Sequence, residues 1–396
     1  MASQVVIIGG GIIGCTTAYY VTHHPSFTAS TVVTVLEASN TGIAQGASGK
    51  AGLTLNGLVN VTFSEHEKLA REHGGEERWG WRYVGAGSWR GRGEKLENVG
   101  TGVGEGGKRK SLEKTNGLPG GEAKKKGRGR KERGLPHDLD WVREDVTQDY
   151  SSMAKAGETA QFTESMMSLA TEKGAKLIQG KAREILVEGG RVKGVLYERE
   201  GMMHTIEASH IVLSAGAWCS QILPQIPMGC TRAHSITLQV KEDVSISPYA
   251  LFTEIQYKSG GKTREVSPEI YARPHGELYA CGPGDDLTLP EDVDRVQCDL
   301  RACESIRDQV CSISDQLSEA TVTARQACYL PVLSSGEGPI VGEATRIAKG
   351  LVIAAGHTCW GICNAPGTAK AVSELVMEGE IKCADLSGLH PSNFGL

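Results

Sequence analysis

Residues 5–14 of the chain read VVIIGGGIIG, and this stretch decides the fold. Four β-branched residues in succession predict a buried strand of a parallel sheet, and a helix is expected directly after the glycines. Gly9, Gly11 and Gly14 form the pattern G-x-G-x-x-G between the two elements. Such glycines allow a tight turn, the approach of a pyrophosphate to the backbone, and close packing of helix on strand. The stretch therefore predicts the phosphate-binding turn of a Rossmann-type domain.

A second strand supports this interpretation. Residues 31–37 read TVVTVLE and end on Glu37, 23 positions after Gly14. A carboxylate at this strand end can accept hydrogen bonds from both ribose hydroxyls of an adenosine, and it repels a 2′-phosphate. NADP is therefore disfavoured, but the motif does not separate NAD from FAD. A glycine-rich turn in another α/β fold is the alternative interpretation.

Composition and charge set outer limits on the class of protein. The chain has 396 residues, a net charge of −5 and a near-average composition, which is typical of a soluble globular protein with one large core or two domains. No apolar run is long enough to span a membrane, and the first strand starts too early to leave room for a signal peptide. We therefore expect a cytoplasmic protein. Eleven scattered cysteines predict reduced thiols rather than disulfides, and their spacing predicts no metal site.

The rest of the chain predicts two kinds of structure. Residues 350–378 read as strand, glycine turn and helix, like the start of the chain. Residues 232–286 alternate between apolar and polar side chains, which predicts an antiparallel sheet that carries the substrate. Helices are expected over residues 157–173 and 293–311, and a β-hairpin over residues 181–197. The predicted fold class is α/β, with a Rossmann-type dinucleotide-binding domain and a second, antiparallel-β substrate domain.

A basic insertion is expected to interrupt these domains. Residues 88–134 contain 13 glycines and 14 lysines or arginines against 6 acids, with few large apolar side chains. Such a segment cannot offset the entropy of ordering its backbone. We expect residues 88–140 to be a disordered insertion, either a solvated loop or translated intron sequence. Because Trp89 is the only aromatic residue between 88 and 134, nucleic-acid binding is not expected.

The predicted division of the chain follows from these patterns. The dinucleotide-binding domain is expected to be discontinuous and to consist of residues 1–62, 141–230 and 338–396. The substrate domain is expected to consist of residues 63–87 and 231–337.

A run of small residues follows the second strand. Residues 42–52 read GIAQGASGKAG and are too poor in apolar bulk to form a core element. Such a segment can fold over a phosphate-bearing ligand and donate main-chain N–H groups, with the Ser48 hydroxyl and Lys50 as further donors. A plain loop is an equally compatible interpretation.

Several motifs together resemble one family. They are the glycine pattern with Glu37, the loop of residues 42–52, SAGAW at 214–218, QACYLP at 326–331 with GPIVG at 338–342, and GHTCWGI at 356–362. This set resembles the D-amino-acid-oxidase superfamily of FAD-dependent oxidoreductases, which includes the glycine oxidase and sarcosine oxidase-like enzymes. The likeness covers nearly the whole chain outside residues 88–134. It is strongest to uncharacterised fungal members, for which SPEIYARP at 267–274 is typical.

The resemblance implies FAD rather than NAD as the cofactor. By this resemblance, the pyrophosphate is expected to be held by Gly9, Gly11, Ile12, Ile13 and Gly14, and the adenosine ribose by Glu37 with Ala38 beside it. The phosphates and the flavin edge are expected to contact Ala47, Ser48, Gly49 and Lys50, and the adenine is expected to contact Lys181 and Ala182. The ribityl chain is expected to lie against Ala215, Gly216 and Trp218, and the isoalloxazine against Gly356, His357, Trp360, Gly361 and Ile362.

The resemblance also implies the chemistry. Family members remove hydride from a carbon next to an amine nitrogen, and O2 usually reoxidises the flavin. The expected partners are therefore O2 and a small amine, imino acid or N-substituted amino acid. The substrate-pocket candidates, which are the catalytic candidates of this sequence, are Tyr271, Arg273, Tyr329 and Trp360.

One departure from the family pattern leaves the substrate open. Glycine oxidase-like members place an arginine where this chain has Leu330, and leucine cannot form a bidentate pair with a substrate carboxylate. Arg273 or Lys50 could take over that charge. A covalent flavin link at Cys328, where sarcosine oxidases attach the cofactor, is not expected. Two alternatives stay open: a dehydrogenase with another electron acceptor, and a flavin-binding protein with a binding or trafficking role.

Overall fold

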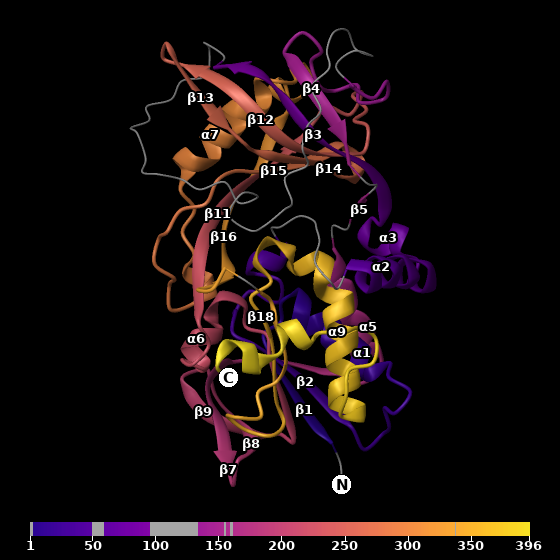
Figure 1. Ribbon diagram of the computed structural model, residues 1–396, viewed down its shortest axis with the longest axis vertical. Coiled ribbons are helices and arrows are strands. Elements are labelled where there is room, and N and C mark those ends of the chain that lie inside the picture. Colours follow the sequence, from indigo (N-terminus) through magenta and orange to yellow (C-terminus); the bar gives the residue numbers. More distant parts are fainter. Residues whose placement is uncertain (1–2, 50–58, 96–133, 154–155, 159–160, 337) are drawn as a thin grey trace.

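The computed structural model describes residues 3–49, 59–95, 134–153, 156–158, 161–336 and 338–396. Two large sheets lie toward opposite ends of the long axis of the molecule (Figure 1). The helices are α1 Ile12–Thr22, α2 Val59–His73, α3 Gly75–Trp79, α5 Phe162–Glu172, α6 Cys219–Ile222, α7 Leu300–Cys311, α8 Asp315–Ser318 and α9 Gly361–Glu378.

The first sheet has six strands in the order β17-β18-β10-β1-β2-β6. Its strands are β1 Gln4–Ile8, β2 Val32–Glu37, β6 Lys176–Gln179, β10 His210–Leu213, β17 Ile340–Glu343 and β18 Leu351–Ala355. All pairs are parallel except β17 with β18. The two predicted strands at the start of the chain are confirmed, and they are neighbours in the sheet.

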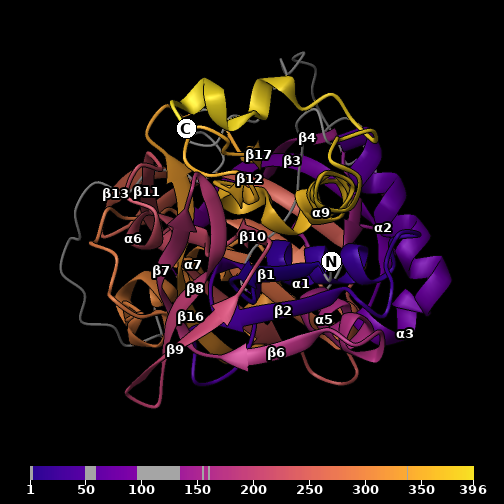
Figure 2. The same ribbon diagram turned by 90° about the horizontal axis from the view of Figure 1, so that it is seen from below.

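The run of β-branched residues in β1 is explained by burial on both faces. Val5 and Ile7 pack into a core with the helices, whereas Val6 and Ile8 pack into a separate core on the other face. Figure 2 shows α1, α5 and α9 on one side of this sheet and the small sheet β7-β8-β9 on the other. That small sheet consists of β7 Lys181–Glu188, β8 Arg191–Arg199 and β9 Met202–Glu207, and it contains the predicted hairpin.

The second large sheet has nine strands, of which seven follow the order β16-β11-β15-β14-β12-β3-β4, while β13 pairs with β12 and β5 with β3. Its strands are β3 Arg82–Glu94, β4 Thr147–Ser152, β5 Ala156–Glu158, β11 Met228–Gln239, β12 Tyr249–Ser259, β13 Lys262–Val266, β14 Glu269–Ala272, β15 Glu277–Cys281 and β16 Thr321–Leu333. All pairs are antiparallel except β12 with β3. The predicted fold class is confirmed, while the domain boundaries stay a prediction.

The predicted insertion at residues 88–140 was too wide at both ends. Strand β3 continues through Ser88 to Glu94, and Trp89 is fully buried with its indole N–H donating to Thr147 at 3.0 Å. The small buried glycines of β3 alternate with exposed charged residues, so the segment has the period of a strand although its composition is that of a linker. Leu135 and Leu139 are buried in the same core. Residues 96–133, the remainder of the predicted insertion, lie outside the described residues.

Two predicted helices are shorter than expected. The helix predicted over residues 293–311 begins only at Leu300, because the Asp299 side chain caps it by accepting from the backbone N–H of Arg301 at 2.9 Å. Before that cap, Val293–Arg295 forms a separate 3-10 turn. The helix predicted over residues 157–173 covers Phe162–Glu172, after the short strand β5.

Gly14 sets the distance between α1 and β1. A Cβ atom at Gly14 would lie 1.9 Å from the carbonyl oxygen of Gly9, so no other residue fits without moving the helix. We predict that Gly14→Ala lowers the free energy of unfolding by about 1–3 kcal/mol through overpacking. Gly388→Ala, at a glycine with open space around it, should leave stability unchanged. Thermal unfolding of the two variants checks this, and equal midpoints would contradict it.

Candidate cofactor-binding site

A large pocket opens at the carboxyl ends of the parallel strands. Its wall is made by the segments that follow β1, β2, β10 and β18, and it contains about 1360 Å³ of space not filled by protein, part of it open to solvent. In open α/β sheets, ligands bind at this edge where the strand order reverses, here on either side of β1.

The glycine turn forms the centre of this wall. Gly9 has a φ of +109°, and a Cβ there would lie 2.5 Å from the carbonyl oxygen of Ser214, so the turn requires glycine. Gly11 is the N-terminal cap of α1 and makes no side-chain cap hydrogen bond. The Ser48 hydroxyl accepts from the backbone N–H of Ile12 at 2.8 Å. Gly11, Ile12 and Ile13 line the pocket, so the N-terminus of α1 faces it, as a pyrophosphate site requires.

Glu37 lies at the end of β2 and lines the pocket, as the sequence predicted. Its two carboxylate oxygens accept from the backbone N–H groups of Gly10 at 2.6 Å and Ser39 at 2.8 Å. Burial raises the pKa of the Glu37 carboxyl, while the hydrogen bonds from Ser39 and Gly10 act against that rise. The carboxylate is thus fixed in orientation by the backbone, with lone pairs left for the hydroxyls of a ribose.

The far end of the pocket is formed by the turn after β18. His357 is buried, and its Nε2 is 3.1 Å from the hydroxyl oxygen of Thr368. Burial lowers the pKa of His357 to about 3, so its ring is neutral at physiological pH. Gly361 and Ile362 begin helix α9 and also line the pocket. A second helix N-terminus therefore faces the same cavity.

Most of the predicted cofactor residues line this one pocket. They are Gly9, Gly11, Ile12, Ile13, Glu37, Ala38, Ala47, Ser48, Lys181, Ala182, Ala215, Gly216, Trp218, Gly356, His357, Gly361 and Ile362. Gly14 packs behind the wall, and Trp360 is not among the described residues that form it. Lys50 lies outside the described residues.

The substrate-pocket candidates are divided. Tyr329 lines the cofactor pocket, and its hydroxyl donates to the carbonyl of Thr288 at 2.9 Å. Tyr271 is buried outside the pocket wall and donates to the carboxylate of Glu269 at 2.7 Å. Arg273 is also outside the wall: it donates to Glu277 at 2.9 Å and lies 4.8 Å over the ring of Tyr279. Trp360 is buried and does not contribute to the wall.

One part of the wall was not found by sequence reasoning. Glu291, Asp292 and Val293 line the pocket although they belong to the loop before α7. Glu291 and Asp292 interact with Lys181, whose predicted role was a backbone contact with adenine. The loop has no periodic pattern, and its acids form pairs with residues more than 100 positions away, so a single sequence contains no signal for it.

Two features of the described residues bear on other classes of protein. No group of three or more His, Cys, Asp or Glu side chains in the described part of the chain is placed to hold a metal ion. None of the described helices combines the length and apolarity needed to cross a membrane. No disulfide joins any of the eleven cysteines, all of which belong to the described residues.

The pocket fits a dinucleotide that carries redox chemistry. It combines a glycine turn in which a Cβ at Gly9 would collide with the backbone, an acid at the end of β2, and a second turn with a neutral histidine and a helix N-terminus at the far end. These features define a dinucleotide-dependent oxidoreductase of the Rossmann type.

Comparison with known proteins gives the family. Residues 4–375 match the model of the FAD dependent oxidoreductase family, so the chain belongs to that family and FAD is its cofactor. The chain is 32% identical to "Putative oxidoreductase TDA3" of Saccharomyces cerevisiae over 505 aligned positions, which cover 98% of this chain and 94% of that protein. The predicted superfamily, cofactor, enzyme class and fungal likeness are confirmed.

Solved structures share the fold. Glycine oxidase from Geobacillus kaustophilus matches with a TM-score of 0.69 and 18% identity, over 98% of each chain. L-proline dehydrogenase from P. horikoshii matches with a TM-score of 0.67 and 18% identity, over 99% of this chain and 98% of that chain.

Replacing the acid at the end of β2 should weaken FAD binding. In Glu37→Gln one side-chain oxygen becomes an NH₂ group, which cannot accept from Gly10 or Ser39 or from a ribose hydroxyl. We predict about a tenfold higher Kd for FAD. Titration of the apoprotein with FAD measures it. The matched control is Glu343→Gln, because Glu343 also accepts a backbone N–H, from Gly350, but does not line the pocket. An unchanged Kd in Glu37→Gln would refute the role of the acid.

The neutral state of His357 predicts a pH dependence of stability. Its folded-state pKa, about 3, lies below the usual value of 6.5, so its contribution is complete above pH 6.5 and is lost as pH falls toward 3. We predict that the difference in melting temperature between the wild type and His357→Asn shrinks from pH 7 to pH 5. His137→Asn, at a fully exposed histidine, should show no such change. A constant difference for His357→Asn would contradict the assignment.

Proposed function

We propose that this protein oxidises the C–N bond of an amine, imino acid or N-substituted amino acid and passes the electrons to O2. When bound, FAD supplies the chemistry by accepting hydride from the carbon next to the nitrogen. Support comes from the enzymes that share the fold. Glycine and L-proline, the compounds in the names of the two enzymes compared above, both have an oxidisable carbon beside an amine nitrogen.

The observation that carries this proposal is a buried, uncharged cluster of side chains beside the cofactor pocket. Ala233, Cys328 and Leu330 form a buried cluster, against which Ala47 and Cys359 pack. Ala47 lines the cofactor pocket, and Cys359 lies between two residues of the turn after β18. An apolar cluster there excludes water and favours the neutral amine over the charged ammonium. The neutral form is needed because the nitrogen lone pair must be available when hydride leaves the adjacent carbon.

The same cluster bears on whether the substrate carries a carboxylate. Leu330 is buried in the cluster and offers no charge to a substrate carboxylate. Arg273, the described cation that the sequence suggested as a replacement, pairs with Glu277 and stacks on Tyr279. These contacts favour amines that lack a carboxylate over simple α-amino acids as substrates.

A second candidate function has some support. Leu330 in place of a substrate-binding arginine also suits a protein that binds FAD for a binding or trafficking role without turnover. A dehydrogenase that uses another acceptor is a variant of the main proposal, and the name of L-proline dehydrogenase supports it.

Anaerobic mixing with a substrate panel tests the proposal. We predict that at least one amine, imino acid or N-substituted amino acid bleaches the flavin absorption band of the holoprotein, and that simple α-amino acids bleach it more slowly. Peroxide formed under air then identifies O2 as the acceptor. Bleaching without peroxide points to a dehydrogenase, and a flavin band that no compound bleaches would refute catalysis and favour the binding role.

A further inference from the structure

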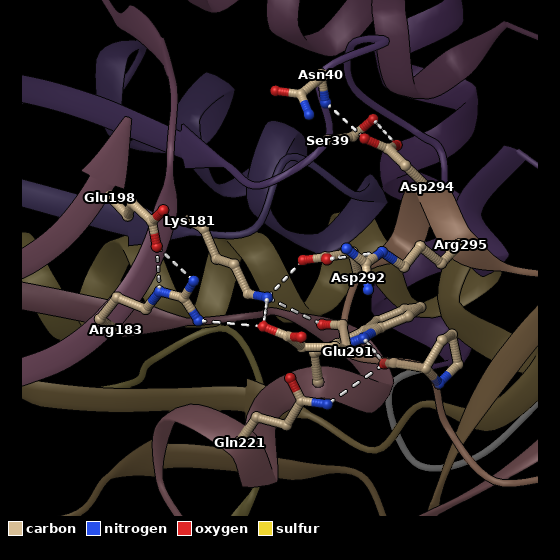
Figure 3. Close-up of polar contacts among 12 residues, drawn as sticks. Ser39, Asn40, Lys181, Arg183, Glu198, Gln221, Glu291, Asp292, Asp294 and Arg295 are labelled. Carbon is tan, nitrogen blue, oxygen red and sulfur yellow. Dashed lines mark hydrogen bonds and ion pairs between the residues drawn. The ribbon is translucent and has the colours of Figure 1, made fainter. Parts of the chain in front are cut away.

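A segment from the nine-stranded half of the molecule covers the cofactor pocket. Residues 290–295, which we call the strap, lie between β15 and α7. Three of them, Glu291, Asp292 and Val293, form part of the wall of the pocket, most of which is made by the segments that follow strands of the six-stranded sheet and by the start of β7. Figure 3 shows the strap with the side chains that hold it.

Three separate anchors attach the strap to the rim of the pocket. At one end, the backbone carbonyl of Pro290 accepts from the indole N–H of Trp218 at 2.9 Å and from the side chain of Gln221 at 3.4 Å. Trp218 lies after β10 and is itself part of the wall. This anchor therefore joins the strap to the segment that the resemblance assigns to the ribityl chain.

A second anchor is made by Asp294. Its carboxylate accepts from the Ser39 hydroxyl and from the backbone N–H of Asn40, the latter at 2.9 Å (Figure 3). Ser39 follows directly on the pocket-lining residues Glu37 and Ala38. Asp294 is also close enough to add to the rise in the pKa of Glu37, so strap and ribose-binding acid share one electrostatic environment.

The central anchor is Lys181, at the start of β7. Its ammonium group donates to the main-chain carbonyl of Glu291 at 3.2 Å, to the Glu291 carboxylate at 3.1 Å, and to the carboxylate of Asp292. Arg183, two residues along the same strand, lies 3.6 Å from Glu291 and pairs with Glu198. The Lys181 side chain is 18% exposed, so this network is screened less than a fully exposed pair.

The partners of each pair lie around one cavity. Lys181, Arg183, Glu291 and Asp292 all line the pocket, and so does Trp218 at the other anchor. The pairs therefore hold the strap against the rest of the pocket wall.

We propose that the strap is the outer wall of the FAD site, that it holds the adenosine half of the cofactor in place, and that its ion pairs set the rate at which FAD leaves. The inference goes beyond the proposed function and holds for any substrate.

The test is the rate of FAD release from the holoprotein. In the double variant Glu291→Gln, Asp292→Asn we expect release about fivefold to tenfold faster at low salt, the size that the loss of two partly screened ion pairs allows. Added salt should accelerate release from the wild type and have little effect on the variant. The increase in flavin fluorescence after dilution gives both rates. The matched control is Lys193→Gln, which removes an exposed pair with Glu188 on the same small sheet but outside the pocket wall.

A charge-reversed pair distinguishes a specific role of the strap in FAD release from a general loss of protein stability. Lys181→Glu combined with Asp292→Lys rebuilds the central pair in the opposite sense and should release FAD more slowly than Lys181→Glu alone. Release rates and salt dependence of the neutralised variant equal to those of the wild type would overturn the proposal. So would a charge-reversed protein that loses FAD as fast as Lys181→Glu. Because the readout is cofactor dissociation, failure of the substrate panel leaves this result unaffected.

Discussion

The close contact between Gly14 and the carbonyl of Gly9 is the constraint on which the rest of the structure depends. It allows α1 to lie directly against β1, so that the first turn of the helix reaches the edge of the sheet. That placement forms the glycine turn of the pyrophosphate site. It also brings the backbone N–H of Gly10 to Glu37 and the backbone N–H of Ile12 to Ser48. Strand β1 is buried on both faces, and each face packs into a different core, so the strand is held in place from both sides.

Local patterns made the Rossmann half of the fold predictable. A run of β-branched residues, a glycine turn and a strand-end acid are adjacent in sequence, and each has a physical cause that acts over a few residues. The residues that the resemblance assigned to FAD accordingly lie in one pocket for the most part. Composition alone predicted the wrong structure at β3. Its glycines suggested a linker, but they occupy buried positions of a strand on either side of Trp89.

Other features were beyond the reach of the sequence because they depend on long-range contacts. The pairing of Lys181 with Glu291 joins residues 110 positions apart, and nothing in either segment marks the other. The parallel pairing of β3 with β12 is similar: alternation predicts strands but not their partners or directions. The orientation of Arg273 toward Glu277 and Tyr279 depends on neighbours in the folded chain, so the sequence could name the cation but not whether a substrate can use it.

The strap links the cofactor pocket to both halves of the molecule. Because its residues come from the nine-stranded half and its anchors from the six-stranded half, FAD bound under the strap would contact parts of both. A ligand that binds only when two halves are joined stabilises their junction by mass action. The amount of correctly assembled protein in a cell would then depend on the supply of flavin, and a shortage of the vitamin would reach this enzyme through its folding as well as through its chemistry.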